Sequence, residues 1–192
     1  MSIGEEIGVR EAMDADLAEM AAILNVEIAA SPYVYAENPV TLDERRGWLE
    51  EHRRAKLPVL VATDASGVVG WASLSPYRAS SGYRFTAEAS VYVARTARRR
   101  GVGALLLGSL LDGPDAPGFH AVVASIDAEN LPSIALFERF GFAEAARLPE
   151  VGRKYDRWRT HLLLLLVRES ASTGLDPAAG ESTVGSRDGT AK

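Results

Sequence analysis

A basic, glycine-rich segment, Arg98-Arg99-Arg100-Gly101-Val102-Gly103, is the first candidate for chemistry in this chain. It follows an apolar strand-like stretch and precedes a leucine-rich stretch of helical character. The N-terminus of a helix has unpaired backbone N–H groups and a dipole that favours an anion. Glycine lets the backbone approach a phosphate closely, and arginine adds charge and paired donors. The segment therefore predicts a phosphate-binding loop, with an ordinary glycine turn and a solvated basic face as the alternative.

Two common phosphate motifs do not fit this segment. A P-loop ends in Gly-Lys-Ser or Gly-Lys-Thr, which is absent from the segment. A dinucleotide fingerprint needs a third glycine, where this chain has Leu106. The spacing Arg98-x-x-Gly101-x-Gly103 instead resembles the Gln/Arg-x-x-Gly-x-Gly/Ala signature of N-acetyltransferases that use acyl-coenzyme A.

A second motif, Asn130-x-x-Ser133-x-x-Leu136-Phe137-x-x-Phe140-Gly141-Phe142, closely resembles an element of the GNAT superfamily and lies at the right distance from the first. Two further segments, residues 88–93 and Gly152-x-Lys154-x-x-x-Trp158, narrow the resemblance from the superfamily to one of its branches. The chain is similar to the phosphinothricin N-acetyltransferase branch, whose members include acetyltransferases of methionine sulfone and methionine sulfoximine. The resemblance covers residues 8–167 and implies acetyl transfer from acetyl-CoA to the amine of a small amino-acid-like substrate.

The resemblance also implies where the cofactor binds. In this family the strand before the loop splays from its neighbour, and the pantetheine arm pairs with the exposed strand edge. The loop then holds the pyrophosphate, and the asparagine of the second motif contacts the arm, besides acting as a helix cap. The implied cofactor-binding residues are Val91, Tyr92, Val93, Arg98, Arg99, Arg100, Gly101, Val102, Gly103, Ala104, Asn130 and Ser133.

Glu88 is the implied catalytic base. An amine with a pKa of about 8 to 10 arrives mostly protonated at neutral pH, so its proton must be removed. In a strand, Glu88 shares one face with Ser90 and Tyr92, while the residues between them share the other. A partly desolvated carboxylate at this position could take the proton directly or through water. The alternative is a surface glutamate in an ion pair.

No motif in the sequence identifies the general acid or the substrate-binding residues as clearly. Many members have a tyrosine where this chain has Phe137, which cannot protonate a thiolate, so no general acid is assigned. A substrate carboxylate needs a cation, and Arg78 and Arg84 precede Glu88 in a loop rich in aromatic residues. Tyr35 follows the first helix, where the substrate wall of the family begins, and packing is its alternative role.

The elements that position these residues follow from local patterns. Residues 14–28 have apolar side chains at helical spacing, and Thr41-Leu42-Asp43-Glu44 is a capping box that starts a second helix. Residues 59–63 and 68–75 predict a hairpin, and further strands are expected near residues 9, 88–93, 121–126, 143–148 and 159–167. Helices are expected after residue 103 and from residue 130 to Gly141.

This order predicts an α/β (α+β) fold with a sheet and helices on both faces. The resemblance implies that the central sheet is mixed and mostly antiparallel. The resemblance adds a splayed strand pair, which makes it the GNAT fold. We expect one N-acetyltransferase domain over residues 1–169 of the 192-residue chain, and a disordered tail over residues 170–192, which lack apolar periodicity.

Composition limits the other function classes. The net charge of −5 argues against nucleic-acid and membrane partners, and the chain has no cysteine, which fits the cytoplasm. The three histidines have no metal-ligand spacing, so no metal is expected. The family is commonly dimeric, which implies a homodimer. The open alternatives are another amine acceptor (a peptide N-terminus, a polyamine or an aminoglycoside) and a non-catalytic sensor that binds acyl-coenzyme A.

Overall fold

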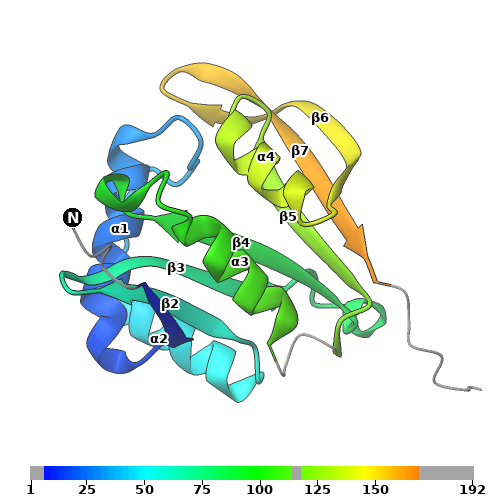
Figure 1. Ribbon diagram of the computed structural model, residues 1–192. Coiled ribbons are helices and arrows are strands. Elements are labelled where there is room, and N and C mark those ends of the chain that lie inside the picture. Colours follow the sequence, from blue (N-terminus) through cyan, green and yellow to red (C-terminus); the bar gives the residue numbers. More distant parts are fainter. Residues whose placement is uncertain (1–6, 114–117, 169–192) are drawn as a thin grey trace, which may run out of the picture.

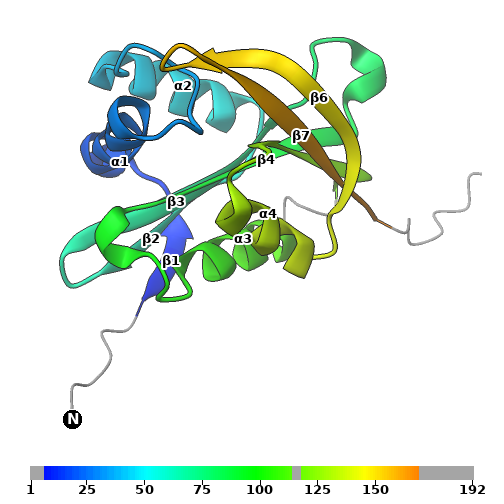
Figure 2. The same cartoon turned by 90° about the horizontal axis from the view of Figure 1, so that it is seen from above.

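Seven strands form one sheet in the order β1-β2-β3-β4-β5-β7-β6 in the computed structural model, which describes residues 7–113 and 118–168. Helices α1 and α2 cover one face of the sheet, and α3 and α4 cover the other (Figures 1 and 2). Within the described residues β4 and β5 pair in parallel and the other neighbours are antiparallel. The predicted fold is therefore confirmed, while the predicted tail lies outside the described residues.

The bounds of the elements agree with the sequence patterns at most ends. The strands are β1 (Gly8–Glu11), β2 (Val59–Asp64), β3 (Gly67–Pro76), β4 (Thr86–Val93), β5 (Ala121–Asp127), β6 (Ala143–Lys154) and β7 (Arg157–Val167). The helices are α1 (Leu17–Ala30), α2 (Leu42–Arg54), α3 (Val102–Asp112) and α4 (Leu131–Arg139). None of the helices in the described part of the chain has the length and apolar character that a bilayer span requires.

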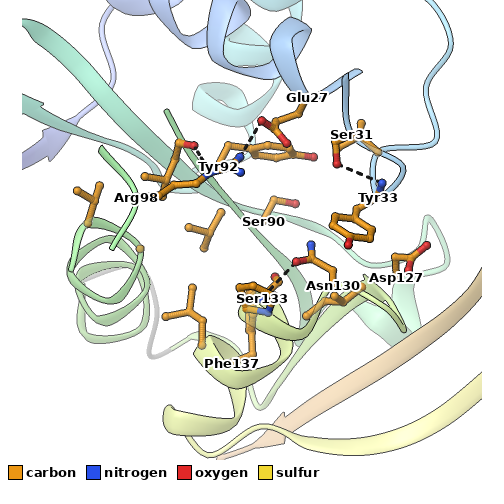
Figure 3. A pocket seen from close by; sticks show the side chains of 18 of the residues that line it. Glu27, Ser31, Tyr33, Ser90, Tyr92, Arg98, Asp127, Asn130, Ser133 and Phe137 are labelled. Carbon is orange, nitrogen blue, oxygen red and sulfur yellow. Dashed lines mark hydrogen bonds and ion pairs between the residues drawn. The ribbon is translucent and has the colours of Figure 1, made fainter. Parts of the chain in front are cut away.

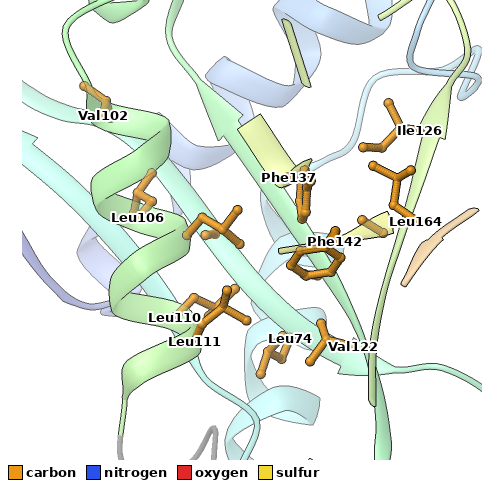
Figure 4. Packing of buried hydrophobic residues seen from close by; sticks show 14 of the residues in the cluster. Leu74, Val102, Leu106, Leu110, Leu111, Val122, Ile126, Phe137, Phe142 and Leu164 are labelled. Carbon is orange, nitrogen blue, oxygen red and sulfur yellow. The ribbon is translucent and has the colours of Figure 1, made fainter. Parts of the chain in front are cut away.

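Strand alternation divides the core into two layers. Leu74 of β3 and Leu106 of α3 belong to the cluster on the α3 and α4 side, which Figure 4 shows. Trp71 of β3 and Leu49 of α2 belong to the cluster on the opposite side. Successive residues of a strand point to opposite faces, so both faces of β2 and β3 are apolar and buried.

The β4 strand is different, because one of its faces is polar. Val91 and Val93 pack with the α3 cluster, whereas Tyr92 packs with the α1 and α2 cluster. Glu88 and Ser90 share the Tyr92 face by alternation. The predicted division of this strand into two faces is confirmed.

The β4–β5 pair separates part of the way along. Its ladder joins Thr86 to Ala121, Ala87 to Val122 and Glu88 to Val123, and it ends there. Both strands continue beyond this point, so the two diverge and leave a gap between their ends (Figure 1). This is the splayed pair that the sequence resemblance implied.

The β6–β7 hairpin is longer than the sequence patterns predicted. The expected strands ended at Leu148 and began again at Arg159, but pairing continues to Lys154 and Arg157. Tyr155 and Asp156 make the turn, both in the left-handed region with φ of 49° and 58°. The extension of β6, residues 149–154, lies at the edge of the sheet and is mostly exposed, so it lacks the apolar alternation that predicts a half-buried strand.

We expect Gly70→Ala to lower the free energy of unfolding by about 1–3 kcal/mol, because the site has no room for a methyl group. The added Cβ would lie 2.9 Å from the Tyr92 carbonyl oxygen and 3.1 Å from side-chain atoms of both Val102 and Leu106. Gly47→Ala is the control, since no atom lies within 4 Å of its added Cβ and alanine favours the helix. Urea unfolding followed by circular dichroism measures both; equal midpoints for Gly70→Ala and the wild type would contradict the expectation.

Candidate active site

A cavity of about 690 Å³ lies where β4 and β5 separate. Its wall is formed by the end of α1 and the segment that follows it, the outer half of β4, the arginine loop, the end of β5 and the start of α4. Figure 3 shows side chains from these elements around the cavity. The lining residues that the sequence predicted as cofactor contacts are Val91, Tyr92, Val93, Arg98, Arg99, Gly101, Val102, Gly103, Ala104, Asn130 and Ser133.

The arginine loop leads into α3 through left-handed backbone. Arg99 has a φ of 63°, and Gly101, the N-cap of α3, has a φ of 83°. Glycine adopts this conformation without a Cβ clash, so the loop can turn sharply into the helix. The first N–H groups of α3 have no partner within the helix, and Val102 and Gly103 line the cavity. The helix thus presents donors and a positive dipole end to the cavity.

The three arginines of the loop have different surroundings. Arg98 pairs with Glu27 of α1 at 2.7 Å, and its Nε donates to the Val93 carbonyl at 3.3 Å (Figure 3). Arg100 pairs with Asp64 at 3.0 Å and does not line the cavity. Arg99 is exposed, lines the cavity and has no ion pair among the described residues. Arg99 is therefore the loop arginine that is available to an anion.

Glu27 was not recognised in the sequence. It lies on α1 with its side chain 10% exposed, and Arg95 pairs with the same oxygen at 3.0 Å as Arg98 does at 2.7 Å. One buried carboxylate therefore holds two arginines next to the cavity. Glu27 occupies a buried position in an apolar helix pattern, and that pattern break is the signal that could have identified it.

The start of α4 forms the opposite wall. Asn130 caps this helix, since its Oδ1 accepts from the Ser133 N–H at 3.4 Å (Figure 3). Gly103 of α3 lies close to α4, because a Cβ there would be 3.2 Å from Leu136 Cδ2 and 3.7 Å from a Val93 methyl group. A side chain at Gly103 would fill the space between the two walls. This space suits a slender arm beside an open strand edge.

The polar face of β4 leads toward Glu88. Ser90 and Tyr92 line the cavity, and Glu88 is half-buried on the same face at the last pair of the β4–β5 ladder. Glu88 is not itself part of the cavity wall. Burial raises the pKa of the Tyr92 phenol, and the positive charge of Arg45 opposes this change.

The predicted substrate contacts lie outside the cavity wall. The Tyr35 hydroxyl donates to Asp127 at 2.8 Å, and burial and this carboxylate raise the pKa of the phenol. Arg78 and Arg84 are exposed and lie over the rings of Tyr77 and Phe85. Because these two guanidinium groups lie in a surface loop, the structure does not join them to the cavity.

Asp127 and Arg159 form a buried ion pair at the end of β5, which the sequence did not reveal. The two groups are joined at 2.7 Å through both oxygens, and their side chains are 1% and 2% exposed. Burial alone would raise the pKa of Asp127, but the bonds from Arg159, the Glu129 amide and Tyr35 outweigh it, so the pKa is lowered. Asp127 also lines the cavity, so this pair positions one wall.

His161 and Phe137 complete the surroundings. His161 lies against the Tyr35 ring, with centroids 5.2 Å apart, and burial lowers its pKa despite the nearby Asp127 and Glu88 carboxylates. Phe137 is 2% exposed and packs edge-on against Phe142 at 5.0 Å. Its ring has no acidic proton, so Phe137 cannot act as the general acid.

We expect Asp127→Asn to lower the free energy of unfolding by about 3–5 kcal/mol at neutral pH, because Arg159 loses its buried counter-charge. The folded-state pKa of Asp127 lies below its usual value. The wild type therefore loses this stabilisation as the pH falls below about 4, and the difference between the proteins narrows. Denaturant unfolding at a series of pH values measures this. Asp43→Asn is the control, with a side chain 90% exposed; an equal loss there would contradict the expectation.

The comparisons with known proteins agree with this geometry. The family described as "Acetyltransferase (GNAT) family" matches residues 21–142. The chain is 40% identical over 151 residues to an L-methionine sulfoximine/L-methionine sulfone acetyltransferase of Pseudomonas paraeruginosa, which covers 78% of this chain and 88% of the relative. It is 38% identical over 156 residues to a phosphinothricin N-acetyltransferase of Streptomyces coelicolor, covering 80% and 91% of the two chains.

A solved structure gives the same result in three dimensions. The yncA protein of Salmonella typhimurium, a putative acetyltransferase solved with its cofactor acetyl-CoA, superposes with a TM-score of 0.82 at 32% identity. The match covers 90% of this chain and 99% of that one. The resemblance inferred from the two sequence motifs is thereby confirmed, and this chain belongs to the GNAT family of acetyltransferases.

Proposed function

We propose that this enzyme moves the acetyl group of acetyl-CoA to the amine of a small amino acid such as methionine sulfone, methionine sulfoximine or phosphinothricin. The observation that supports this most directly is the cavity between β4 and β5, with the arginine loop at one part of its wall. The named acceptors are those of its relatives. We further expect a cytoplasmic homodimer that needs no metal and binds neither nucleic acid nor membrane.

The cavity wall suits the parts of acetyl-CoA. The first N–H groups of α3 and the exposed Arg99 would hold the pyrophosphate. The open edge of β4 beyond Glu88 would pair with the amide groups of the pantetheine arm, as a strand pairs with a peptide. Arg98 and Arg100 would act by holding the loop in shape, because Glu27 and Asp64 occupy their guanidinium groups. Asn130 and Ser133 would contact the arm from α4.

Acetyl-CoA supplies an activated thioester carbonyl at the end of this arm. In the proposed reaction the amine nitrogen forms a bond to the acetyl carbon, and the bond between that carbon and sulfur breaks. Glu88 takes the proton from the amine, directly or through a water molecule. The thiolate leaves with the bonding electrons, and solvent supplies its proton, because Phe137 cannot. The products are the N-acetyl amino acid and coenzyme A.

One feature of the site argues against a non-catalytic sensor. A non-catalytic sensor would need no base, yet a half-buried carboxylate, Glu88, lies where β4 and β5 part.

Tyr35, Arg78 and Arg84 stay predicted substrate contacts. A panel of methionine sulfone, methionine sulfoximine, phosphinothricin, polyamines, an aminoglycoside and a peptide, assayed by thiol release, tests the acceptor class. Turnover of the peptide or polyamine alone would overturn the proposal.

We expect Glu88→Gln to lower kcat about 10²- to 10⁴-fold, because the amide cannot accept the proton of the amine. The dissociation constant for acetyl-CoA should not change. Steady-state thiol release and calorimetric titration with acetyl-CoA measure these quantities. Glu50→Gln, on the exposed side of α2, is the control; full turnover in Glu88→Gln would exclude this residue as the base.

We expect Arg99→Gln to raise the dissociation constant for coenzyme A about tenfold without changing Tm, because a charged hydrogen bond to phosphate is lost. Arg98→Gln should raise this dissociation constant and also lower Tm, since it removes one of the two cations that pair with buried Glu27. Calorimetric titration and thermal unfolding distinguish the two effects. Wild-type affinity in Arg99→Gln would show that this arginine does not contact the cofactor.

A further inference from the structure

Tyr33, in the segment between α1 and α2, places a phenol in the cavity wall. Among the described residues, the tyrosines that line the cavity are Tyr33 and Tyr92. Within residues 7–113 and 118–168 the Tyr33 hydroxyl forms no hydrogen bond, whereas the Tyr35 hydroxyl donates to Asp127 at 2.8 Å. Figure 3 shows the Tyr33 ring pointing into the cavity, toward Asn130. The proton of this phenol is therefore available to a ligand.

The backbone of this wall segment is held in place at both ends. The Tyr33 N–H donates to Ser31 Oγ at 3.2 Å. Lys154, which is 6% exposed at the end of β6, donates from its Nζ to the Ile28 carbonyl at 2.9 Å and to the Ala36 carbonyl. One buried ammonium group thus ties the last turn of α1 to the far end of the segment. The phenol therefore has little freedom to lose when a ligand binds.

Tyr33 lies at the end of the cavity where the thioester of the cofactor would be. The arginine loop, which would hold the pyrophosphate, follows Val93 at one end of β4. The pantetheine arm would run from there along β4 toward Glu88, and its sulfur would lie near Ser90. In the view of Figure 3, Ser90 lies between Arg98 and Tyr33. The phenol is thus on the side of the sulfur and not of the pyrophosphate.

The leaving group of the proposed reaction benefits from an acid at this place. Negative charge develops on sulfur as its bond to the acetyl carbon breaks, and a positioned donor can neutralise it. Phe137 has no acidic proton, and the serine hydroxyls in the wall give up a proton far less readily than a phenol does. The carboxylates in the wall, Glu27 and Asp127, are paired with arginines.

Tyr92 is the other phenol in the wall, but its surroundings do not suit this role. Its ring stacks on that of Trp71, with centroids 4.5 Å apart, and it packs in the cluster on the α1 and α2 side. Burial raises the pKa of the Tyr92 phenol, which makes it a weaker acid. Tyr33 is therefore the better acid among the described residues of the wall.

We propose that Tyr33 is the general acid of this enzyme. As the bond between the acetyl carbon and sulfur breaks, its electrons stay with sulfur, the Tyr33 hydroxyl proton passes to the sulfur, and coenzyme A leaves as the thiol. The phenolate then takes a proton from water, and Glu88 releases to water the proton that it removed from the amine. Solvent thus remains the source of the proton. The assignment rests on the proposed function, because it adds a group to its leaving-group step.

Tyr33→Phe tests the assignment, since it removes the hydroxyl and keeps the ring. In a single turnover with methionine sulfone, acetyl transfer from acetyl-CoA should slow about 10- to 100-fold, because the thiolate must leave without its acid. Tm and the dissociation constant for acetyl-CoA should not change. Tyr155→Phe is the control, because this hydroxyl binds the Ala29 carbonyl outside the cavity wall. Mass spectrometry of the acetylated product and calorimetry measure these quantities; a wild-type rate in Tyr33→Phe overturns the inference.

The selenium analogue of acetyl-CoA distinguishes an acid from a group that only shapes the cavity. A selenol is a much stronger acid than a thiol, so a selenolate leaves readily without a proton. Transfer from this analogue should slow less than about threefold in Tyr33→Phe, because a good leaving group needs little acid catalysis. Equal slowing with the sulfur and selenium donors would show a structural role and would overturn the inference.

Failure of the proposed function can be told apart from failure of this assignment. If the wild type acetylates a polyamine or a peptide and no amino acid, the proposed function is wrong, and the two donors with that amine still decide the role of Tyr33. If the wild type acetylates methionine sulfone and Tyr33→Phe does so at the same rate, only the assignment is wrong. A wild type that acetylates no amine of the panel contradicts both.

Discussion

The hydrogen-bond ladder between β4 and β5 ends at Glu88 and Val123, and the site depends on this interruption. Strand edges are normally paired or covered, because open N–H and C=O groups lose hydration without compensation. Here the two strands continue past their last pair and diverge around the cavity. The unpaired edge of β4 therefore faces the cavity, and in the proposed reaction the end of the ladder sets where the reacting groups meet.

Buried charges hold the two sides of this gap apart. On the β4 side, Glu27 pairs with Arg95 and Arg98, and Arg98 also binds the carbonyl of the last β4 residue. On the β5 side, Asp127 receives both Arg159 and the Tyr35 hydroxyl. A buried charge destabilises a protein unless it is paired, so each cluster tolerates only one arrangement of its elements. Contacts within the chain thus hold the walls of the cavity in position.

The two faces of β4 have separate roles. Val91 and Val93 anchor the strand to α3 and carry the loop with it, while Glu88, Ser90 and Tyr92 face the opposite side. Burying the first face stabilises the strand, which leaves the second free to be polar. Arg45 lies on this second side, and within residues 7–113 and 118–168 its Nε and Nη2 atoms have no hydrogen-bond partner. The carboxylate proposed as the base therefore lies on the polar face of β4.

Local patterns in the sequence determined the order of the elements, the caps at Thr41 and Asn130, the glycine-rich turn into α3 and the family, because periodicity and motif spacing are properties of neighbouring residues. Only the tertiary structure decided which arginines are available. Arg98 and Arg100 pair with Glu27 and Asp64, which lie far earlier in the chain, while Arg99 has no ion pair in the part of the chain that the structure describes. The burial of Arg45 and the pairing of Asp127 with Arg159 were equally hidden. Such contacts join segments that are remote in sequence, and no local period encodes them.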